Sequence, residues 1–351
     1  PDKPFADDFK VSPDDVKEPS EVTLTLSSRE NEELISYHPY KLDRTKPLPE
    51  PVRPLDPDPK SIDNVEELYY IGMRNLQFHQ AHVDPNIYFE EALRRDPYDV
   101  RCNTQLGIFY RMNGDYDKAK YYLRRSLKRQ TSSYTRPADG ESMYNLGLIL
   151  KAEGNYDAAT DTLYRAVWDY EYASAAYFQL AQISSIRRNS EKAAEEAGMA
   201  VAYNGMNIDA KNLLTTLLRY SGKTAEAKKT AAEVVALDPL NYYATRELAM
   251  LGAKSEEEAA KLLRGVSESY IELALYYLNN GFDTDAEEVL EKAESLKSYP
   301  TVEYYLGYLA DRRGDREAAG RWFRKAESGS IDYVFPFRLE TIGVFGKALE
   351  Y

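Results

Sequence analysis

The stretch Gly140–Trp168, GESMYNLGLILKAEGNYDAATDTLYRAVW, decides how the fold of this 351-residue chain is interpreted. After Leu146 it carries small residues at spaced positions: Gly147, Gly154, Ala159 and Ala166. Small residues let two helices approach closely, and a glycine between them allows a left-handed turn at least cost. We therefore predict two packed helices joined by a turn at Gly154.

The same pattern recurs along the chain at a fixed period. Leu146, Leu180 and Leu214 are each 34 residues apart, and six units in total match this leucine position: Leu106, Leu146, Leu180, Leu214, Leu273 and Leu306. The first of these units is 40 residues long, which leaves six extra residues in the loop around Thr131–Gly140. A helix pair of this kind cannot bury its apolar face alone, so we expect stacked pairs that share one core.

The period and its Leu, Gly, Tyr and Ala markers resemble the tetratricopeptide repeat. The resemblance implies an all-α fold, a right-handed superhelical solenoid of tetratricopeptide repeats. We expect seven to eight units over residues 61–333, one of them shortened near Leu248. Residues 334–351 are predicted to form a C-terminal capping helix.

The N-terminal part has a different composition, with eleven of the 17 prolines in residues 1–59. Apolar and polar residues alternate from Val22 to Leu26 and resume at Leu34 after a polar turn, which predicts a β-hairpin within residues 1–46. Since a lone hairpin is marginal in water, we expect it to be the remnant of an upstream β-sandwich domain or to lie on the helices. Residues 47–60 are predicted to be an extended, Pro-rich linker.

The first predicted helix follows this linker. Asp63 with Glu66 three residues later is typical of a capping box, in which two side chains satisfy free backbone N–H groups. Helical periodicity dominates from there to the end of the chain.

Composition excludes several classes of function. The net charge of −13 argues against a general nucleic-acid binder, whose affinity comes from clustered cations. No apolar run approaches the length of a membrane helix, so no membrane partner is expected. The single cysteine, Cys102, fits a reducing compartment, and we expect a cytoplasmic location. With three histidines and one thiol, we expect no cofactor, no metal and no catalytic residue in this chain.

The first helix of each unit is expected to line the inner surface of the solenoid. With the residue after the marker leucine as position eight, positions five and twelve face inward. From these positions we take six candidate binding-groove residues: Arg111, Lys151, Arg219, Tyr144, Phe178 and Asn212. Cations and rings along one groove of an acidic protein suit an extended acidic peptide or a neighbouring domain of the same chain. Two alternatives stay open: that the cations simply solvate a helix face, and that residues 1–60 fill the groove.

Several stretches carry a more specific resemblance: YFEEALRRDP at 88–97, GESMYNLGL at 140–148, AYFQLA at 176–181, LDPL at 237–240 and FPFRLE at 335–340. Together they resemble the C-terminal half of a bacterial family of unknown function. In that family an aldose-mutarotase-like β-sandwich domain precedes tetratricopeptide repeats. The resemblance implies a link to carbohydrate metabolism only by analogy.

These observations favour a non-catalytic interaction or scaffold module. We expect it to bind a protein segment, or its own N-terminal domain, through the inner groove. The alternative is that the chain is the helical half of a carbohydrate-active protein, mutarotase-like or glycoside-processing, whose catalytic β-domain lies outside this chain. In that case carbohydrate would be bound only indirectly by these helices.

Overall fold

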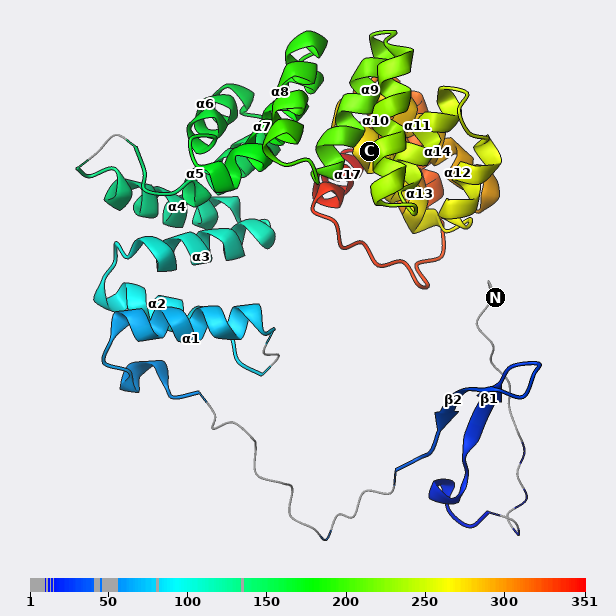
Figure 1. The fold of residues 1–351 in the computed structure, drawn as a ribbon, viewed down its shortest axis with the longest axis horizontal. Helices are drawn as coiled ribbons and strands as arrows, with labels where there is room; N and C mark the ends of the chain where they lie inside the picture. The colour runs from blue at the N-terminus through cyan, green and yellow to red at the C-terminus, as the bar shows by residue number, and fades with distance from the viewer. Residues whose placement is uncertain are drawn as a thin grey trace. The chain divides into compact units, whose positions relative to one another are not determined.

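The computed structural model describes residues 16–40, 56–79, 82–133 and 136–351, with the isolated residues 10, 12, 14 and 45. The chain divides into two compact units, Pro1–Asp56 and Pro57–Tyr351, and each is described by itself (Figure 1). Most of the predicted Pro-rich linker, residues 47–55, lies outside the described residues.

The N-terminal unit contains a short antiparallel hairpin, as predicted. Strand β1 (Leu24–Ser27) pairs with β2 (Glu33–Tyr37), with Leu26 opposite Ile35 and a register shift directly after Leu26. The apolar side chains of the hairpin are more than half exposed: Leu24, Leu26, Leu34, Ile35 and Tyr37. The sandwich domain that we expect to cover them stays a prediction.

The second unit is built from helices. They are α1 (Val65–Gln77), α2 (Asn86–Arg95), α3 (Val100–Met112), α4 (Tyr116–Gln130), α5 (Glu141–Ala152), α6 (Tyr156–Ala166), α7 (Tyr170–Ile186), α8 (Ser190–Tyr203), α9 (Ile208–Tyr220), α10 (Thr224–Leu237), α11 (Tyr242–Met250), α12 (Glu256–Leu263), α13 (Ser267–Leu278), α14 (Asp283–Leu296), α15 (Pro300–Arg312), α16 (Arg316–Glu327) and α17 (Glu340–Ala348). Consecutive helices from α1 to α16 pack in pairs, and each pair packs on the next. The predicted all-α solenoid of stacked helix pairs is therefore confirmed. Among the described helices, none combines the length and the apolar character that a membrane crossing needs.

The small residues of the repeat have the packing and turn roles expected of them. A Cβ atom added at Gly147 would lie 2.7 Å from the side chain of Leu163, so α5 and α6 pack too closely there for any larger residue. Gly154 turns the chain between these helices with a φ of 74°. Arg188 takes the same left-handed conformation in the next pair, with a φ of 60°, which costs a residue with a Cβ atom about 1–2 kcal/mol.

The start of α1 differs from the prediction by one residue. Asn64, not Asp63, is the N-cap, and its side-chain Oδ1 accepts the backbone N–H of Glu66 at 2.9 Å. The shortened unit near Leu248 is the pair of α11 and α12, with nine and eight residues. A capping box between Ser255 and Glu258 begins α12, where the backbone N–H groups would otherwise lack acceptors.

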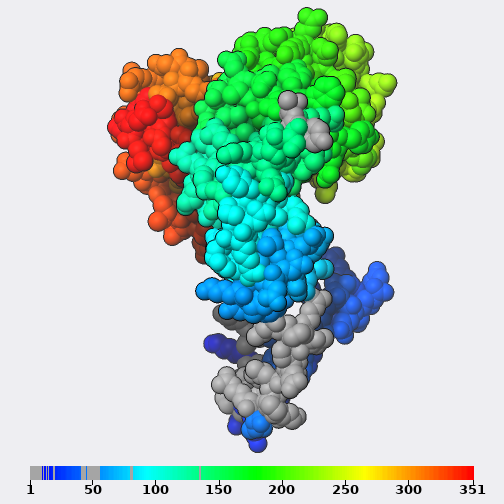
Figure 2. All heavy atoms as spheres, turned by 90° about the vertical axis from the view of Figure 1, so that its left-hand side faces the viewer, coloured from blue at the N-terminus to red at the C-terminus, as the bar shows by residue number. Residues whose placement is uncertain are grey.

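The chain end closes the last helix pair. Residues 328–339 form no helix, and α17 then packs on α15, where the ring of Phe345 lies 5.1 Å from that of Tyr304. Val344 is buried in this contact. Figure 2 shows the last residues, in red, at the surface beside the earlier helices in green and cyan.

Candidate functional site

Arg111 and Lys151, which we call the inner cation pair, lie in the last turns of α3 and α5. The Nε of Arg111 donates to Oδ1 of Asn145 at 3.0 Å. The Nδ2 of Asn145 in turn donates to the backbone oxygen of Glu141, which fixes the orientation of the amide. Arg111 is thus held by a neutral oxygen, and burial lowers the pKa of its guanidinium.

Lys151 has similar surroundings on the next repeat. Its Nζ donates to Oε1 of Gln179 at 2.7 Å and to Oε1 of Gln182, both on α7. Burial lowers the pKa of Lys151 from 10.5 to about 7, and the negative charge of Glu340 opposes this shift. In the described part of the chain, neither member of the inner cation pair forms an ion pair with a carboxylate. Both side chains therefore have neutral hydrogen-bond partners, and Lys151 carries its full charge only below about pH 7.

Aromatic side chains adjoin the inner cation pair. The ring of Tyr144 lies 5.4 Å from that of Tyr172, and burial raises the pKa of the Tyr144 hydroxyl. Glu141, one turn before Tyr144, also has a raised pKa, mainly because of burial. Phe178 is half-buried on α7 and packs against the largest apolar cluster of the unit. Tyr144 acts on Arg111 and hydrogen-bonds to Gln179, a partner of Lys151, so this ring lies beside the inner cation pair. Phe178 directly precedes Gln179 on α7.

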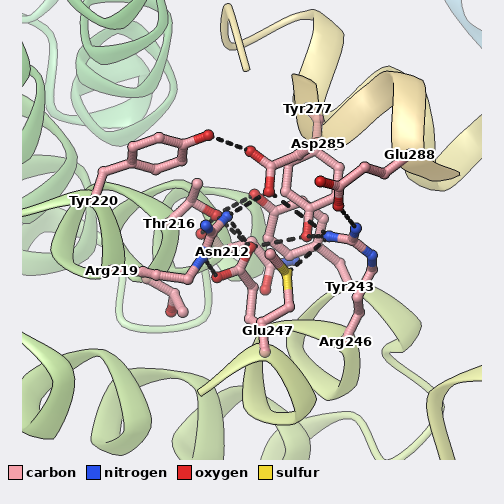
Figure 3. A network of polar contacts seen from close by, with 12 residues as sticks. Asn212, Thr216, Arg219, Tyr220, Tyr243, Arg246, Glu247, Tyr277, Asp285 and Glu288 are labelled. Carbon is pink, nitrogen blue, oxygen red and sulfur yellow. Dashed lines mark hydrogen bonds and ion pairs between the residues drawn. The ribbon is translucent and has the colours of Figure 1, made fainter. Parts of the chain in front are cut away.

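The other two candidate residues lie elsewhere, in a buried polar network on α9, α11 and α14 (Figure 3). Arg219 donates to Glu247 at 2.7 and 3.1 Å and to Asp285 at 2.8 Å. Glu247 is fully buried and also accepts from the hydroxyls of Thr216 and Tyr277. The charge of Arg219 is therefore already neutralised.

Further contacts extend the network to neighbouring helices. Tyr220 donates to Asp285 at 2.5 Å, and Arg246 donates to Glu288 at 3.2 Å. Asn212 is 1% exposed and donates to Asn241 at 3.5 Å. Breaking a buried ion pair leaves an uncompensated charge, so this network fixes how α9, α11, α13 and α14 pack.

The structure thus brings three predicted residues together, Arg111, Tyr144 and Lys151, with Phe178 on the following repeat. It places Asn212 and Arg219 in the buried network. The residues that sequence reasoning missed are the amides at the inner cation pair, Asn145 and Gln179, and the acidic partners of Arg219. No sequence signal singled these out, because carboxylates and amides are frequent throughout the chain.

Two shallow cavities adjoin the loop around Thr131–Gly140, which connects α4 to α5. One of about 420 Å³ is lined in part by Tyr98, Arg101 and Arg129, and one of about 110 Å³ by Arg136 and Trp168. Neither is lined by the inner cation pair. Within the described residues, no group of three or more histidine, cysteine or carboxylate side chains could hold a metal ion.

Comparisons with known proteins agree with this architecture. The family model described as tetratricopeptide repeat matches residues 100–167, which span α3 to α6. The match identifies α3 to α6 as tetratricopeptide repeats, and stacked helix pairs precede and follow them in the same solenoid.

Solved structures similar to this chain include other repeat proteins. A tetratricopeptide repeat protein from Parabacteroides merdae is 16% identical, with a TM-score of 0.47, and the match covers 82% of this chain and 99% of that one. Yeast Tom70 is 16% identical, with a TM-score of 0.46, over 83% of this chain and 64% of that one. The C-terminal part of a repeat protein from Cytophaga hutchinsonii is 13% identical, with a TM-score of 0.44, over 80% and 99%.

Proposed function

We propose that the inner surface around Arg111, Tyr144, Lys151 and Phe178 binds a protein segment, and that the chain is a non-catalytic interaction scaffold. Tetratricopeptide solenoids are curved stacks whose concave side offers an extended surface to a ligand. The bound segment comes from another protein or from the N-terminal part of the same protein. Asn212 and Arg219 support this surface indirectly, because their network holds α9 in place.

The observation that carries the proposal is the unmatched charge of the inner cation pair. Two other partly buried cations of this acidic chain reach carboxylates: Lys120 pairs with Glu153, and Arg219 with Glu247 and Asp285. Within the described residues, the hydrogen bonds of the Arg111 and Lys151 side chains go to amide oxygens. A carboxylate on an incoming segment would provide the missing countercharge through charge-assisted hydrogen bonds, which are about twice as strong as neutral ones.

The test is capture of proteins from a lysate by the immobilised full chain, quantified by mass spectrometry. We expect a set of captured proteins to be lost with the double variant Arg111→Glu/Lys151→Glu. The matched control is Arg313→Glu/Arg321→Glu, which makes the same change of charge at surface cations already paired with Glu287 and Glu317. Equal capture by the wild type and the first double variant, with unchanged thermal unfolding, would refute the surface. The carbohydrate alternative stays a prediction.

A further inference from the structure

The chain end reaches the repeat that carries Arg111. A Cβ atom added at Gly114, in the turn between α3 and α4, would lie 3.4 Å from Cδ1 of Ile342 and 3.7 Å from Cδ2 of Leu339. Gly114 lies only three residues after Arg111 in the chain. Residues 338–342, which we call the C-terminal segment, thus lie against the early repeats although they follow the last one.

Glu340, in the middle of the C-terminal segment, lies close enough to Lys151 for its charge to act on that amine. Its Oε1 accepts a hydrogen bond from Nδ2 of Asn279 at 3.1 Å. Its charge also acts on Lys151, as described above. The pKa of Tyr116, at the start of α4, is raised mainly by burial; Arg111 opposes this rise, and Glu340 adds to it. Within the described residues, Glu340 has no ion pair of its own. An acidic side chain of the same chain is therefore near Lys151, while Leu339 and Ile342 contact the turn that follows Arg111.

The C-terminal segment is anchored at its two ends. On one side Arg338 forms an ion pair with Glu268. On the other side α17 is fixed to the last helix pair, where the hydroxyl of Tyr351 donates to Asp311 at 2.5 Å. These anchors keep the segment at a high effective concentration near the early repeats.

The contact itself is small, and the chain before it is loosely held. Leu339 is 36% exposed and Ile342 is 61% exposed, so little apolar surface is removed from water. Among the described contacts, residues 331–337 make no hydrogen bond to any helix, and four of their large apolar side chains are more than two-thirds exposed: Ile331, Tyr333, Phe335 and Phe337. A competing ligand would therefore give up little apolar contact at Leu339 and Ile342, although it would have to replace the hydrogen bond between Glu340 and Asn279.

We propose that the C-terminal segment is a built-in, displaceable occupant of the surface around Arg111 and Lys151. The partner that displaces it has the same chemistry, a carboxylate flanked by apolar side chains as in Leu339-Glu340-Thr341-Ile342. This inference rests on the proposed function, because it assigns regulation and a ligand class to the same surface. Partner affinity is then set by competition with residues already tethered in place.

The test uses a fluorescein-labelled peptide of residues 334–344, VFPFRLETIGV, titrated with the full chain and followed by anisotropy. We expect the peptide to bind at least tenfold more tightly to the variant Leu339→Asp/Ile342→Asp, which we call the vacated variant, than to the wild type. The reason is that the C-terminal segment of this variant no longer occupies the surface. The matched control Ile331→Asp/Tyr333→Asp introduces the same charges into exposed positions and keeps the wild-type affinity. Adding Arg111→Glu/Lys151→Glu to the vacated variant abolishes binding of the peptide.

The outcomes separate this inference from the function on which it rests. The peptide could bind the wild type and the vacated variant equally well and lose affinity when Arg111 and Lys151 are changed. This result would refute occupation by the C-terminal segment but support the proposed binding surface. Peptide affinity that is unaffected by Arg111→Glu/Lys151→Glu would refute the proposed binding surface. If the vacated variant has a lowered unfolding temperature, Glu340→Gln is used in its place. We then expect added peptide to accelerate the amide hydrogen exchange of residues 338–342 in this variant. Unchanged exchange would contradict the proposal.

Discussion

The hydroxyl of Ser185, near the end of α7, donates a hydrogen bond to the backbone oxygen of Asn280, 2.6 Å away in the turn between α13 and α14. Ninety-five residues separate the two in the chain. The solenoid therefore bends far enough for repeats that are not neighbours to touch. The same turn brings Gly281 against the backbone of Ile186, where an added Cβ atom would lie 3.1 Å from its Cα.

This contact makes Gly281 sensitive to substitution. We expect Gly281→Ala to lower the free energy of unfolding by about 1–3 kcal/mol more than Gly222→Ala, because the methyl group meets the backbone of Ile186. Gly222 is the matched control, since it has a similar positive φ of 73° and open space around it. Its substitution costs only the backbone strain of about 1–2 kcal/mol. Urea unfolding of both variants measures the difference, and equal losses would contradict the contact.

The buried network on α9 and α11 predicts a large effect at Glu247. We expect Glu247→Ala to destabilise the fold by about 3–5 kcal/mol, because Arg219 and the hydroxyl of Tyr277 lose a buried acceptor. Glu317→Ala removes an exposed carboxylate paired with Arg321 and should change stability by less than about 0.5 kcal/mol. Chemical denaturation compares the two, and similar small effects would show that the network contributes little.

The glycines inside helices should respond in opposite directions. Gly147→Ala places a methyl group into Leu163 and is expected to cost about 1–3 kcal/mol. Gly198 in α8 has nothing within 4 Å of an added Cβ atom, so Gly198→Ala should stabilise by about 0.5–1 kcal/mol through helix propensity alone. Thermal unfolding distinguishes them, and a stabilised Gly147→Ala variant would show that the α5–α6 approach is not tight.

Lys151 predicts a pH dependence of ligand binding near neutrality. Because burial lowers its pKa to about 7, the amine loses its proton as the pH rises from 6 to 8.5, and a carboxylate ligand loses its countercharge. We expect the affinity of the 334–344 peptide for the vacated variant to fall by up to about tenfold per pH unit above 7. Lys151→Arg keeps its charge throughout and should bind with little pH dependence; an equally steep fall in this variant would assign the proton to another group.

The lowered pKa of Lys151 also makes the stability of the fold depend on pH. The unfolded chain holds the Lys151 proton up to a pKa near 10.5, whereas the folded chain releases it near 7. The contribution of this group to the free energy of unfolding therefore rises between these two pH values and is constant below them.

Much of the fold could be predicted from the sequence because repeats leave a periodic trace. The marker leucines and turn glycines gave the helix pairs, and alternation from Val22 to Leu26 gave the hairpin. Asn64 replaced Asp63 as cap because either side chain can accept the N–H groups of a first turn, and sequence does not fix which one does.

The candidate site was harder to predict for a physical reason. Position in the repeat predicted that Arg111, Tyr144 and Lys151 lie on neighbouring helices α3 and α5, since that depends on local helix geometry. Their role in binding stays a prediction. It could not show that Arg219 pairs with Asp285 or that Glu340 lies near Lys151, because those contacts depend on how far the whole stack bends. Each repeat holds only local information on that bend.

The contact of Ile342 with the turn at Gly114 bears on how the helical unit unfolds. In an open array, stability is close to a sum of nearest-neighbour increments, and repeats can fray from either end. The contact at Gly114, added to the buried hydrogen bond between Ser185 and Asn280, raises the mean sequence separation of native contacts, which slows folding and couples distant repeats. Deleting one terminal repeat here should therefore weaken distant repeats as well, so that the unit melts in a more concerted way than its repeat count suggests.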